Sequence, residues 1–328
     1  MEIGIRVPSY ARPGMSREDS HALRTYARRA EDLGFDALWV VEHLLVAPEI
    51  YGTSWLDPLQ VLAFLSACTE RVRLGTAILV LPFRHPVVLA KEVASLSVLS
   101  GERLVVGVGP GWYEKEFAAV GVPMTERGRR TDEALRVLRL LLTGPQVSFD
   151  GEFVHFEDVT IEPRPSSIPK FWVAGGSSTD PSQRTPAMHQ AVLRRIVAAD
   201  GWLAGSSGRH PAEVLRDWDT IRRFAGSNGR DPDSLIFAQT QFLHIVDTAD
   251  RARAIEEQVP EFLRVMGAHR DLAELQACYL FGTVDDMLER LRVLKQAGLR
   301  HLVLTPLTSD VNQLELIKRH LAPELRAL

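Results

Sequence analysis

The chain has 328 residues, 45% hydrophobic and 24% charged, a composition typical of a folded soluble protein with a sizeable core. A formal net charge of -4 and a pI near 6.2 provide no broad basic field, which excludes sequence-independent nucleic-acid binding. No run approaches the ~18 uninterrupted apolar residues of a membrane span. The N-terminus, MEIGIRVPSY, predicts a strand and not a targeting peptide. Cys68 and Cys278 have no metal-type spacing and are expected to be buried thiols, so we expect a cytoplasmic protein.

Strand and helix patterns alternate along the whole chain. Ser16 to Asp19 form a capping-box pattern, and Gly34 and Gly298 are typical helix stops. The expected strands are Ile3–Val7, Asp36–Val41, Val72–Leu81, Leu104–Val108, Lys170–Ala174, Asp200–Leu203, Leu235–Val246 and His301–Leu304. The expected helices are Ser16–Leu33, Asp57–Thr69, His85–Leu99, Trp112–Leu142 (broken near Gly121), Ala187–Ala199, Pro211–Ala225, Ala249–Met266, Val284–Ala297 and Val311–Leu325.

Eight strand and helix units in one chain predict an α/β protein with a single closed (β/α)8 TIM barrel over residues 1–328. An open doubly wound sheet is the alternative. Insertions are expected at about 44–56, 147–165 and 267–281. Within the second of these, Asp150-Gly151 is a two-residue hairpin signal between short alternating runs.

Functional residues of such a barrel lie at the C-terminal strand ends. That rule selects Glu42-His43, Pro82–Arg84, Pro110–Tyr113, Gly175–Ser178, Ala204–Gly208 and Thr305-Pro306. His43 is the acid-base candidate, because an imidazole exchanges protons near neutral pH. Glu42 is either a second carboxyl of the site or a structural partner.

Glycines mark three of these strand ends. Gly107, Gly109 and Gly111 form a hinge between a buried strand and a helix, where the chain either makes a bare turn or lets a ligand approach. Gly175–Ser178 and Gly205–Gly208 are glycine-serine turns that either hold a phosphate at a helix start or are ordinary surface loops. No His-x-x-x-His or His-Glu-x-x-His spacing is present, so no metal site is expected.

Several segments together resemble one family. The segments DLGFDALWVVEH, ERVRLGTAILVLPFRHPVVLAKEVASLSVLSGERLVVGVGPGWYEKEF, SFDGEFVHF and PKFWVAGG are similar to those of the bacterial-luciferase-like oxidoreductases, in order and at family spacing. The resemblance covers most of residues 1–176 closely and the remainder loosely. It implies a (β/α)8 barrel, frequently a homodimer, that binds reduced FMN or the deazaflavin coenzyme F420 at its C-terminal mouth.

The F420-dependent branch is the nearer one. Its members carry an acidic residue and a His like Glu42-His43, and a Gly-Pro-Gly like Gly109-Pro110-Gly111. They also have a cis peptide behind the ring that would fall at Ala77–Ile78. Segment 178–189 is longer than the usual family turn. The cofactor-binding set expected from the resemblance and the glycine-serine turns is Glu42, Ala77, Ile78, Pro110, Gly111, Gly175, Gly176, Ser177, Gly205 and Ser206.

The resemblance implies an oxidoreductase that transfers a hydride between F420 and an organic substrate, with His43 as the catalytic proton donor or acceptor. The alternatives are an FMN-dependent monooxygenase supplied by a partner flavin reductase, and a non-catalytic flavin-binding protein. Trp112 stands where F420-dependent glucose-6-phosphate dehydrogenase has an acidic residue, so glucose 6-phosphate is not expected as substrate. The substrate-binding candidates, each also a candidate core residue, are Trp55, Phe83, Trp112 and Tyr113.

Overall fold

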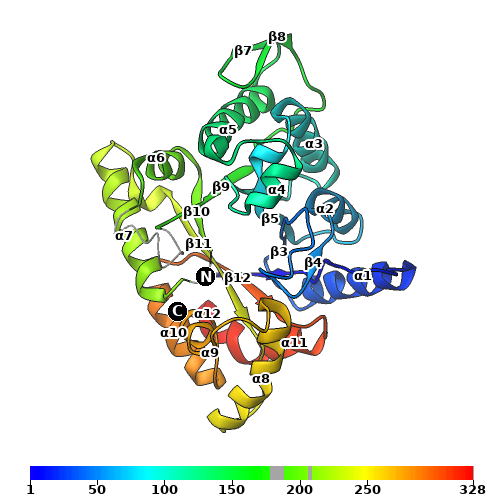
Figure 1. Cartoon of the computed structure of the whole chain (residues 1–328), viewed down its shortest axis with the longest axis vertical. Helices are drawn as coiled ribbons and strands as arrows, with labels where there is room; N and C mark the ends of the chain where they lie inside the picture. The colour runs from blue at the N-terminus through cyan, green and yellow to red at the C-terminus, as the bar shows by residue number, and fades with distance from the viewer. Residues whose placement is uncertain (178–187, 206–208, 328) are drawn as a thin grey trace.

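The computed structural model, which describes residues 1–177, 188–205 and 209–327, is a closed barrel of eight parallel strands (Figure 1). Neighbouring strands pair in the order β1-β3-β5-β6-β9-β10-β11-β12, and β12 pairs with β1 to close the barrel. The closed barrel predicted from the sequence is therefore confirmed, and the open sheet is wrong. The strands are β1 (Glu2–Arg6), β3 (Ala37–Val40), β5 (Arg73–Val80), β6 (Leu104–Gly109), β9 (Lys170–Ala174), β10 (Gly201–Ala204), β11 (Ile236–Leu243) and β12 (His301–Pro306).

Helices surround the barrel, as the sequence predicts. Ser16 and Asp19 form the expected capping box of the first helix, and Thr283 caps α10 in the same way. Within the described ranges, no helix is long and apolar enough to cross a membrane. The helices are α1 (Arg17–Asp32), α2 (Pro58–Ser66), α3 (Pro86–Leu99), α4 (Glu114–Ala119), α5 (Arg127–Thr143), α6 (Gln190–Ala198), α7 (Pro211–Ser227), α8 (Arg251–Met266), α9 (Leu272–Cys278), α10 (Val284–Gln296), α11 (Asn312–Leu316) and α12 (Ala322–Ala327).

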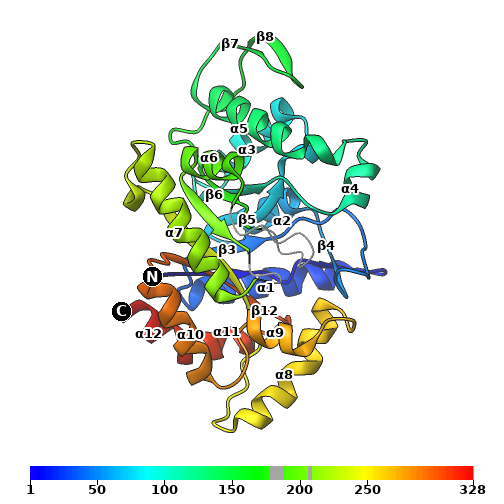
Figure 2. The same cartoon turned by 60° about the vertical axis from the view of Figure 1, so that its left-hand side comes forward.

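The insertions carry small elements of their own. Segment 44–56 contains β4 (Ser54–Trp55), which pairs antiparallel with β2 (Tyr10–Ala11), a contact the sequence did not predict. Segment 147–165 forms the hairpin of β7 (Val147–Asp150) and β8 (His155–Val159), which projects beyond α5 in Figures 1 and 2. Segment 267–281 contains α9. Residues 178–187 of the expected insertion 178–189 lie outside the described part of the chain.

The hairpin is real, but its connection is not the two-residue turn that Asp150-Gly151 suggests. Residues 151–154 link the two strands, and Gly151 N donates to Val154 O at 3.0 Å. The buried Glu133 carboxylate of α5 accepts hydrogen bonds from Glu152 N at 2.7 Å and Phe153 N at 2.9 Å. This tertiary anchor widens the turn because it holds backbone N–H groups that a two-residue turn would not present to α5.

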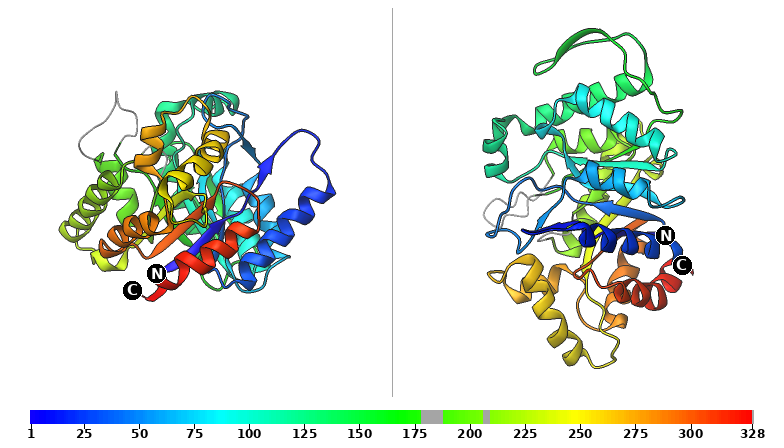
Figure 3. Two further views of the ribbon diagram at one scale, coloured as in Figure 1. Left: turned by 90° about the horizontal axis from the view of Figure 1, so that it is seen from below. Right: turned by 90° about the vertical axis from the view of Figure 1, so that its right-hand side faces the viewer.

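Aromatic side chains fill the barrel interior. Trp39 and Trp172 stack with ring centroids 5.2 Å apart, and Trp39 Nε1 lies 3.0 Å from His301 Nε2. His301 Nδ1 in turn lies 3.0 Å from Glu2 Oε2 at the start of β1. These side chains fill the barrel interior at this level, so a binding site must lie nearer the C-terminal ends of the strands. The two chain ends lie side by side (Figure 3), because the first and last barrel strands pair. Both cysteines are buried.

Candidate active site at the barrel mouth

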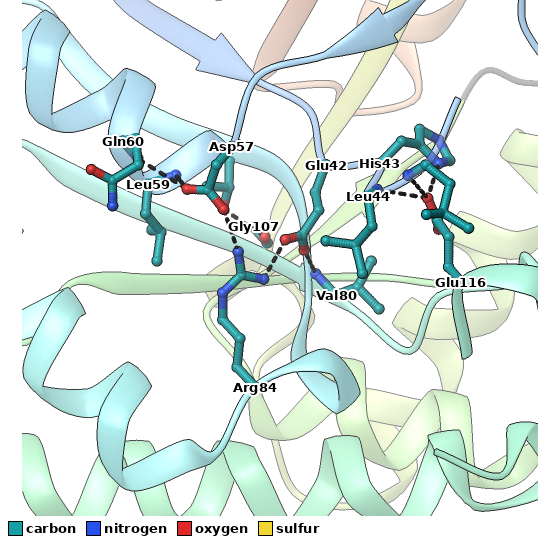
Figure 4. A network of polar contacts seen from close by, with 12 residues as sticks. Glu42, His43, Leu44, Asp57, Leu59, Gln60, Val80, Arg84, Gly107 and Glu116 are labelled. Atoms are coloured by element: carbon teal, nitrogen blue, oxygen red, sulfur yellow. Dashed lines mark hydrogen bonds and ion pairs between the residues drawn. The ribbon is translucent and has the colours of Figure 1, made fainter. Parts of the chain in front are cut away.

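His43 follows β3 and is oriented by a buried carboxylate. Its Nδ1 lies 3.3 Å from Glu116 Oε1 of α4 (Figure 4). The same oxygen accepts hydrogen bonds from Leu44 N at 2.7 Å and Leu45 N at 3.3 Å. Glu116 is only 2% exposed, so its carboxylate fixes both the loop and the imidazole ring. Because Nδ1 faces Glu116, Nε2 is the ring nitrogen left for proton exchange with a ligand.

Three aromatic rings surround His43. The ring centroids of Tyr51, Trp55 and Trp112 lie 5.2, 5.3 and 6.0 Å from that of the imidazole. Tyr51 and Trp55 also meet edge to face, with centroids 5.1 Å apart. Trp112 is 53% exposed at the rim, a large apolar surface of the kind that binding sites present. The structure therefore brings Trp55 and Trp112 to His43, as the sequence predicts, and adds Tyr51, which it did not.

Two other predicted substrate contacts lie elsewhere. Tyr113 is buried, and its hydroxyl donates to Glu49 Oε1 at 2.5 Å. Phe83 packs edge to face against Phe117, with centroids 5.0 Å apart. Tyr113 also lies beside Trp112, with ring centroids 6.1 Å apart.

Glu42 points away from its neighbour His43 (Figure 4). Its carboxylate accepts a hydrogen bond from Val80 N at 2.5 Å and pairs with the Arg84 guanidinium. Arg84 also reaches Asp57 at 2.9 Å, and Asp57 caps the N-terminus of α2. Burial raises the pKa of Glu42, against the opposing charge of Arg84. In this structure Glu42 ties the ends of β3 and β5 together, which is the structural alternative of the two roles considered for it.

The ends of β5 and β6 form one predicted part of the cofactor site. The Ala77–Ile78 peptide is cis, as the resemblance implies. A Cβ at Gly109 would overlap the Ile78 side chain. Gly111 has φ 73, and a Cβ there would lie 2.6 Å from Val80 Cγ1. Glycine is favoured most strongly at position 111, where φ is positive, while at position 109 it leaves room for the Ile78 side chain.

The turn after β9 contacts a buried ion pair. Ser177 N donates to Asp217 Oδ2 at 2.8 Å, and Arg209 Nη2 donates to Ser177 Oγ at 3.0 Å. Arg209 and Asp217 pair with each other, and a Cβ at Gly176 would overlap the guanidinium. Gly175, the other predicted residue here, has φ 152. Neither Arg209 nor Asp217 was selected from the sequence, because neither immediately follows a strand.

Two observations fit an anionic group at this end of the mouth. Arg209 is 5% exposed, and its Nε has no hydrogen-bond partner among the described residues. An added Cβ at Gly205, after β10, would have no described atom within 4 Å. A buried donor without a described partner suits the phosphate-bearing tail of a flavin or deazaflavin. Ser206, predicted to contact that tail, lies outside the described residues.

A closed (β/α)8 barrel with an oriented histidine among aromatic rings at its C-terminal mouth is the arrangement of a barrel enzyme. The chain belongs to the luciferase-like monooxygenase family, whose sequence profile matches residues 1–301. It spans little more than half, 57%, of the length of the first curated relatives that it matches.

Relatives with different cofactors are similar to this chain. The FMNH(2)-dependent dimethylsulfone monooxygenase of Pseudomonas putida is 27% identical over 295 residues, covering 80% of this chain and 77% of that protein. The F420-dependent glucose-6-phosphate dehydrogenase of Amycolatopsis mediterranei is 36% identical over 163 residues, 46% of each chain. The structure of an F420-dependent secondary alcohol dehydrogenase superposes with a TM-score of 0.79 and 19% identity over 99% of both chains. These similarities establish the fold and the family, and leave the choice of cofactor open.

Proposed function

We propose that the protein is an F420-dependent oxidoreductase that exchanges a hydride with an organic substrate, with His43 as its proton donor or acceptor. The observation that carries this proposal is the imidazole of His43, held by Glu116 among three aromatic rings. Interconversion of an alcohol and a carbonyl requires one proton at the substrate oxygen for each hydride moved at carbon. One oriented imidazole supplies that proton.

The residues that would hold the coenzyme lie along one arc of the mouth. Ala77, Ile78 and the Gly109-Pro110-Gly111 hinge would support the ring, and the turn at 175–177 with Arg209 and Gly205 would hold the phosphate. When bound, a deazaflavin accepts or donates the hydride. Glu42 supports this arc indirectly, because it fixes Val80 at the end of β5.

The side chains of this chain supply the rest of the chemistry. His43 Nε2 accepts the proton of a substrate hydroxyl in the oxidative direction and returns it in the reductive direction. The carboxylate of Glu116 stabilises the imidazolium that forms, since a charge-assisted hydrogen bond is stronger than a neutral one. Trp55 and Trp112 flank the imidazole and place apolar surface beside it.

An FMN-dependent monooxygenase is the second candidate. The specific observation in its favour is the alignment with the dimethylsulfone monooxygenase, which covers 80% of this chain against 46% for the F420-dependent dehydrogenase. Such an enzyme would depend on a partner reductase for reduced flavin. Oxygen uptake with reduced FMN and a candidate substrate distinguishes the two functions, because a deazaflavin does not support that oxygen chemistry.

Titration of the protein with F420 and with FMN, followed by fluorescence, tests the proposal directly. We expect micromolar binding of F420 and weaker binding of FMN; micromolar binding of FMN alone would reverse the order of the two candidates. His43→Ala should keep F420 binding and lose turnover. His155→Ala is the matched control, because His155 also faces a carboxylate, Asp150 at 2.6 Å, but on the distant hairpin. Unchanged turnover in His43→Ala would refute the proton-transfer role.

A further inference from the structure

Arg6, the last residue of β1, points into the barrel. Ile3 and Ile5 on the same strand are completely buried in the layer beneath the helices. Gly4 faces the opposite way, since a Cβ there would overlap the Trp39 side chain inside the barrel. Successive side chains of a strand alternate between faces, so Arg6 shares the inward face of Gly4, one layer nearer the mouth.

The guanidinium of Arg6 enters a cleft that adjoins the rings around His43. Its central carbon lies 5.0 Å from the centroid of the Phe242 ring on β11. Trp55 lines this cleft and also lies 5.3 Å from His43, centroid to centroid. Trp55 is thus shared by the rings around His43 and by this small cleft, whose lining includes Arg6, Tyr10, Trp55, Phe242 and Thr305.

The charge of Arg6 has no counterion in the described part of the chain. The buried guanidinium groups of Arg195 and Arg209 pair with Asp132 and Asp217. Arg6 forms no such pair within residues 1–177, 188–205 and 209–327, and its Nε is buried without a hydrogen-bond partner. Arg6 is half-buried, and the lack of a described counterion distinguishes it from these two paired arginines.

The surroundings of Arg6 are uncharged hydroxyl groups and rings. Burial lowers the pKa of Arg6, and the groups that oppose this shift are tyrosines: Tyr51, Tyr10 and Tyr279. Thr305, in the same cleft, is 3% exposed, and its hydroxyl also has no partner among the described residues. The guanidinium Nε and this hydroxyl therefore line the same cleft without a described partner, and both can donate to an anion.

We propose that Arg6 and Thr305 bind the carboxylate of an anionic organic substrate, whose apolar part lies against Trp55 toward His43. This inference names the substrate class of the proposed oxidoreductase site and rests on that function for its chemistry. A carboxylate matches the planar fork of a guanidinium in two parallel hydrogen bonds and supplies the missing counterion.

Arg6 is not explained by a purely structural role. The described contact of its guanidinium is with the ring of Phe242, which does not neutralise the charge. A ligand carboxylate would supply the counterion that the described residues do not. A half-buried cation at the mouth is placed where it can bind an anion.

Binding of benzoate and of benzamide to the full-length protein, measured by calorimetry, tests the inference with two probes of nearly equal shape. We expect wild type to bind benzoate at least tenfold more tightly than benzamide. Arg6→Gln should weaken benzoate binding at least tenfold and leave benzamide unchanged, and Arg6→Lys should lie between. The control is Arg24→Gln, because Arg24 also stacks over a phenylalanine, Phe64 at 5.6 Å, but on the exposed face of α1.

Thermal unfolding of the same variants provides the second measurement. Arg6→Gln should unfold at the same temperature as wild type or higher, because an unpaired charge is removed. Equal binding of acid and amide, undiminished benzoate binding by Arg6→Gln, or a midpoint lowered by several degrees would each overturn the inference. Tighter binding of benzenesulfonate than of benzoate would overturn the choice of carboxylate.

The two proposals fail separately. If the protein binds benzoate through Arg6 but binds neither F420 nor FMN, the proposed function is refuted and the anion site is supported. Tight F420 binding without discrimination between acid and amide would do the reverse.

Discussion

Replacement of Glu116 by Gln removes one charge at nearly constant shape. The amide oxygen of Gln can still accept the hydrogen bond from Leu44 N, which the carboxylate accepts at 2.7 Å. The interaction lost is that of the negative charge with the imidazolium of His43, whose Nδ1 lies 3.3 Å from the carboxylate. The loop should therefore stay in place while the charged form of the catalytic group loses its partner.

The expected loss in turnover follows from the strength of such a bond. Hydrogen bonds to charged groups contribute about 1.5–3 kcal/mol, and the long Nδ1 to Oε1 distance favours the lower end. Since ~1.4 kcal/mol in the barrier is a factor of ten, kcat should fall roughly 10-fold and at most about 100-fold. KM should change little, because Glu116 lies behind His43 and is almost completely buried.

Steady-state kinetics of a double-mutant cycle with His43→Ala provides the decisive test. If Glu116 acts through His43, Glu116→Gln should cost nothing further in the His43→Ala background. An equal loss in both backgrounds would refute the reasoning. The matched control is Glu31→Gln, since Glu31 is also buried and accepts backbone hydrogen bonds, from Arg71 N at 2.6 Å and Val72 N at 3.0 Å, away from the mouth. It should lower stability and leave kcat unchanged.

Two further substitutions test the supports of the barrel. Glu42→Gln should lower the free energy of unfolding by about 3 kcal/mol in urea denaturation, because it removes the buried carboxylate that pairs with the Arg84 guanidinium. A variant with unchanged stability and weakened cofactor binding would instead indicate that Glu42 contacts the cofactor. The hydrogen bond with His301 holds the pKa of Glu2 at about 2, below its usual 4.5, against the effect of burial and with help from Arg73. Because the pKa of Glu2 is lowered in the folded state, its carboxylate stabilises the fold above pH 4.5, and this contribution is lost as the pH falls toward 2. The difference in urea midpoint between wild type and Glu2→Gln should therefore shrink over this pH range. A constant difference would contradict this role of Glu2.

The barrel could be predicted from sequence because each local signal agrees with the global fold. The capping box at Ser16 and the cap at Thr283 mark helix starts in the printed sequence, and the structure has both. The hairpin turn failed for the opposite reason, since its length depends on Glu133, a residue of α5 that local turn rules do not consider.

The candidate site was only half predictable. Strand-end position identified His43, Trp112 and the glycines, because the carboxyl ends of parallel strands meet at one edge. The rule missed Glu116, which lies within a helix and reaches His43 by a contact 73 residues away in sequence. It also did not select Arg6, although Arg6 ends the first strand and the alternation of Ile3 and Ile5 already places it on the other face. That alternation is the signal that could have identified it.

The partners of a buried charged side chain indicate whether that side chain has a structural or a catalytic role in this barrel. Glu31, Glu116 and Glu133 each accept backbone hydrogen bonds and hold a loop. Of these three carboxylates, Glu116 is the one with a described contact to a histidine, His43. A carboxylate that holds a loop and an imidazole together places the acid-base group on a rigid support, which efficient proton transfer requires. Arg6 is the converse case, a half-buried cation with no counterion among the described residues, and its counterion should arrive with the substrate.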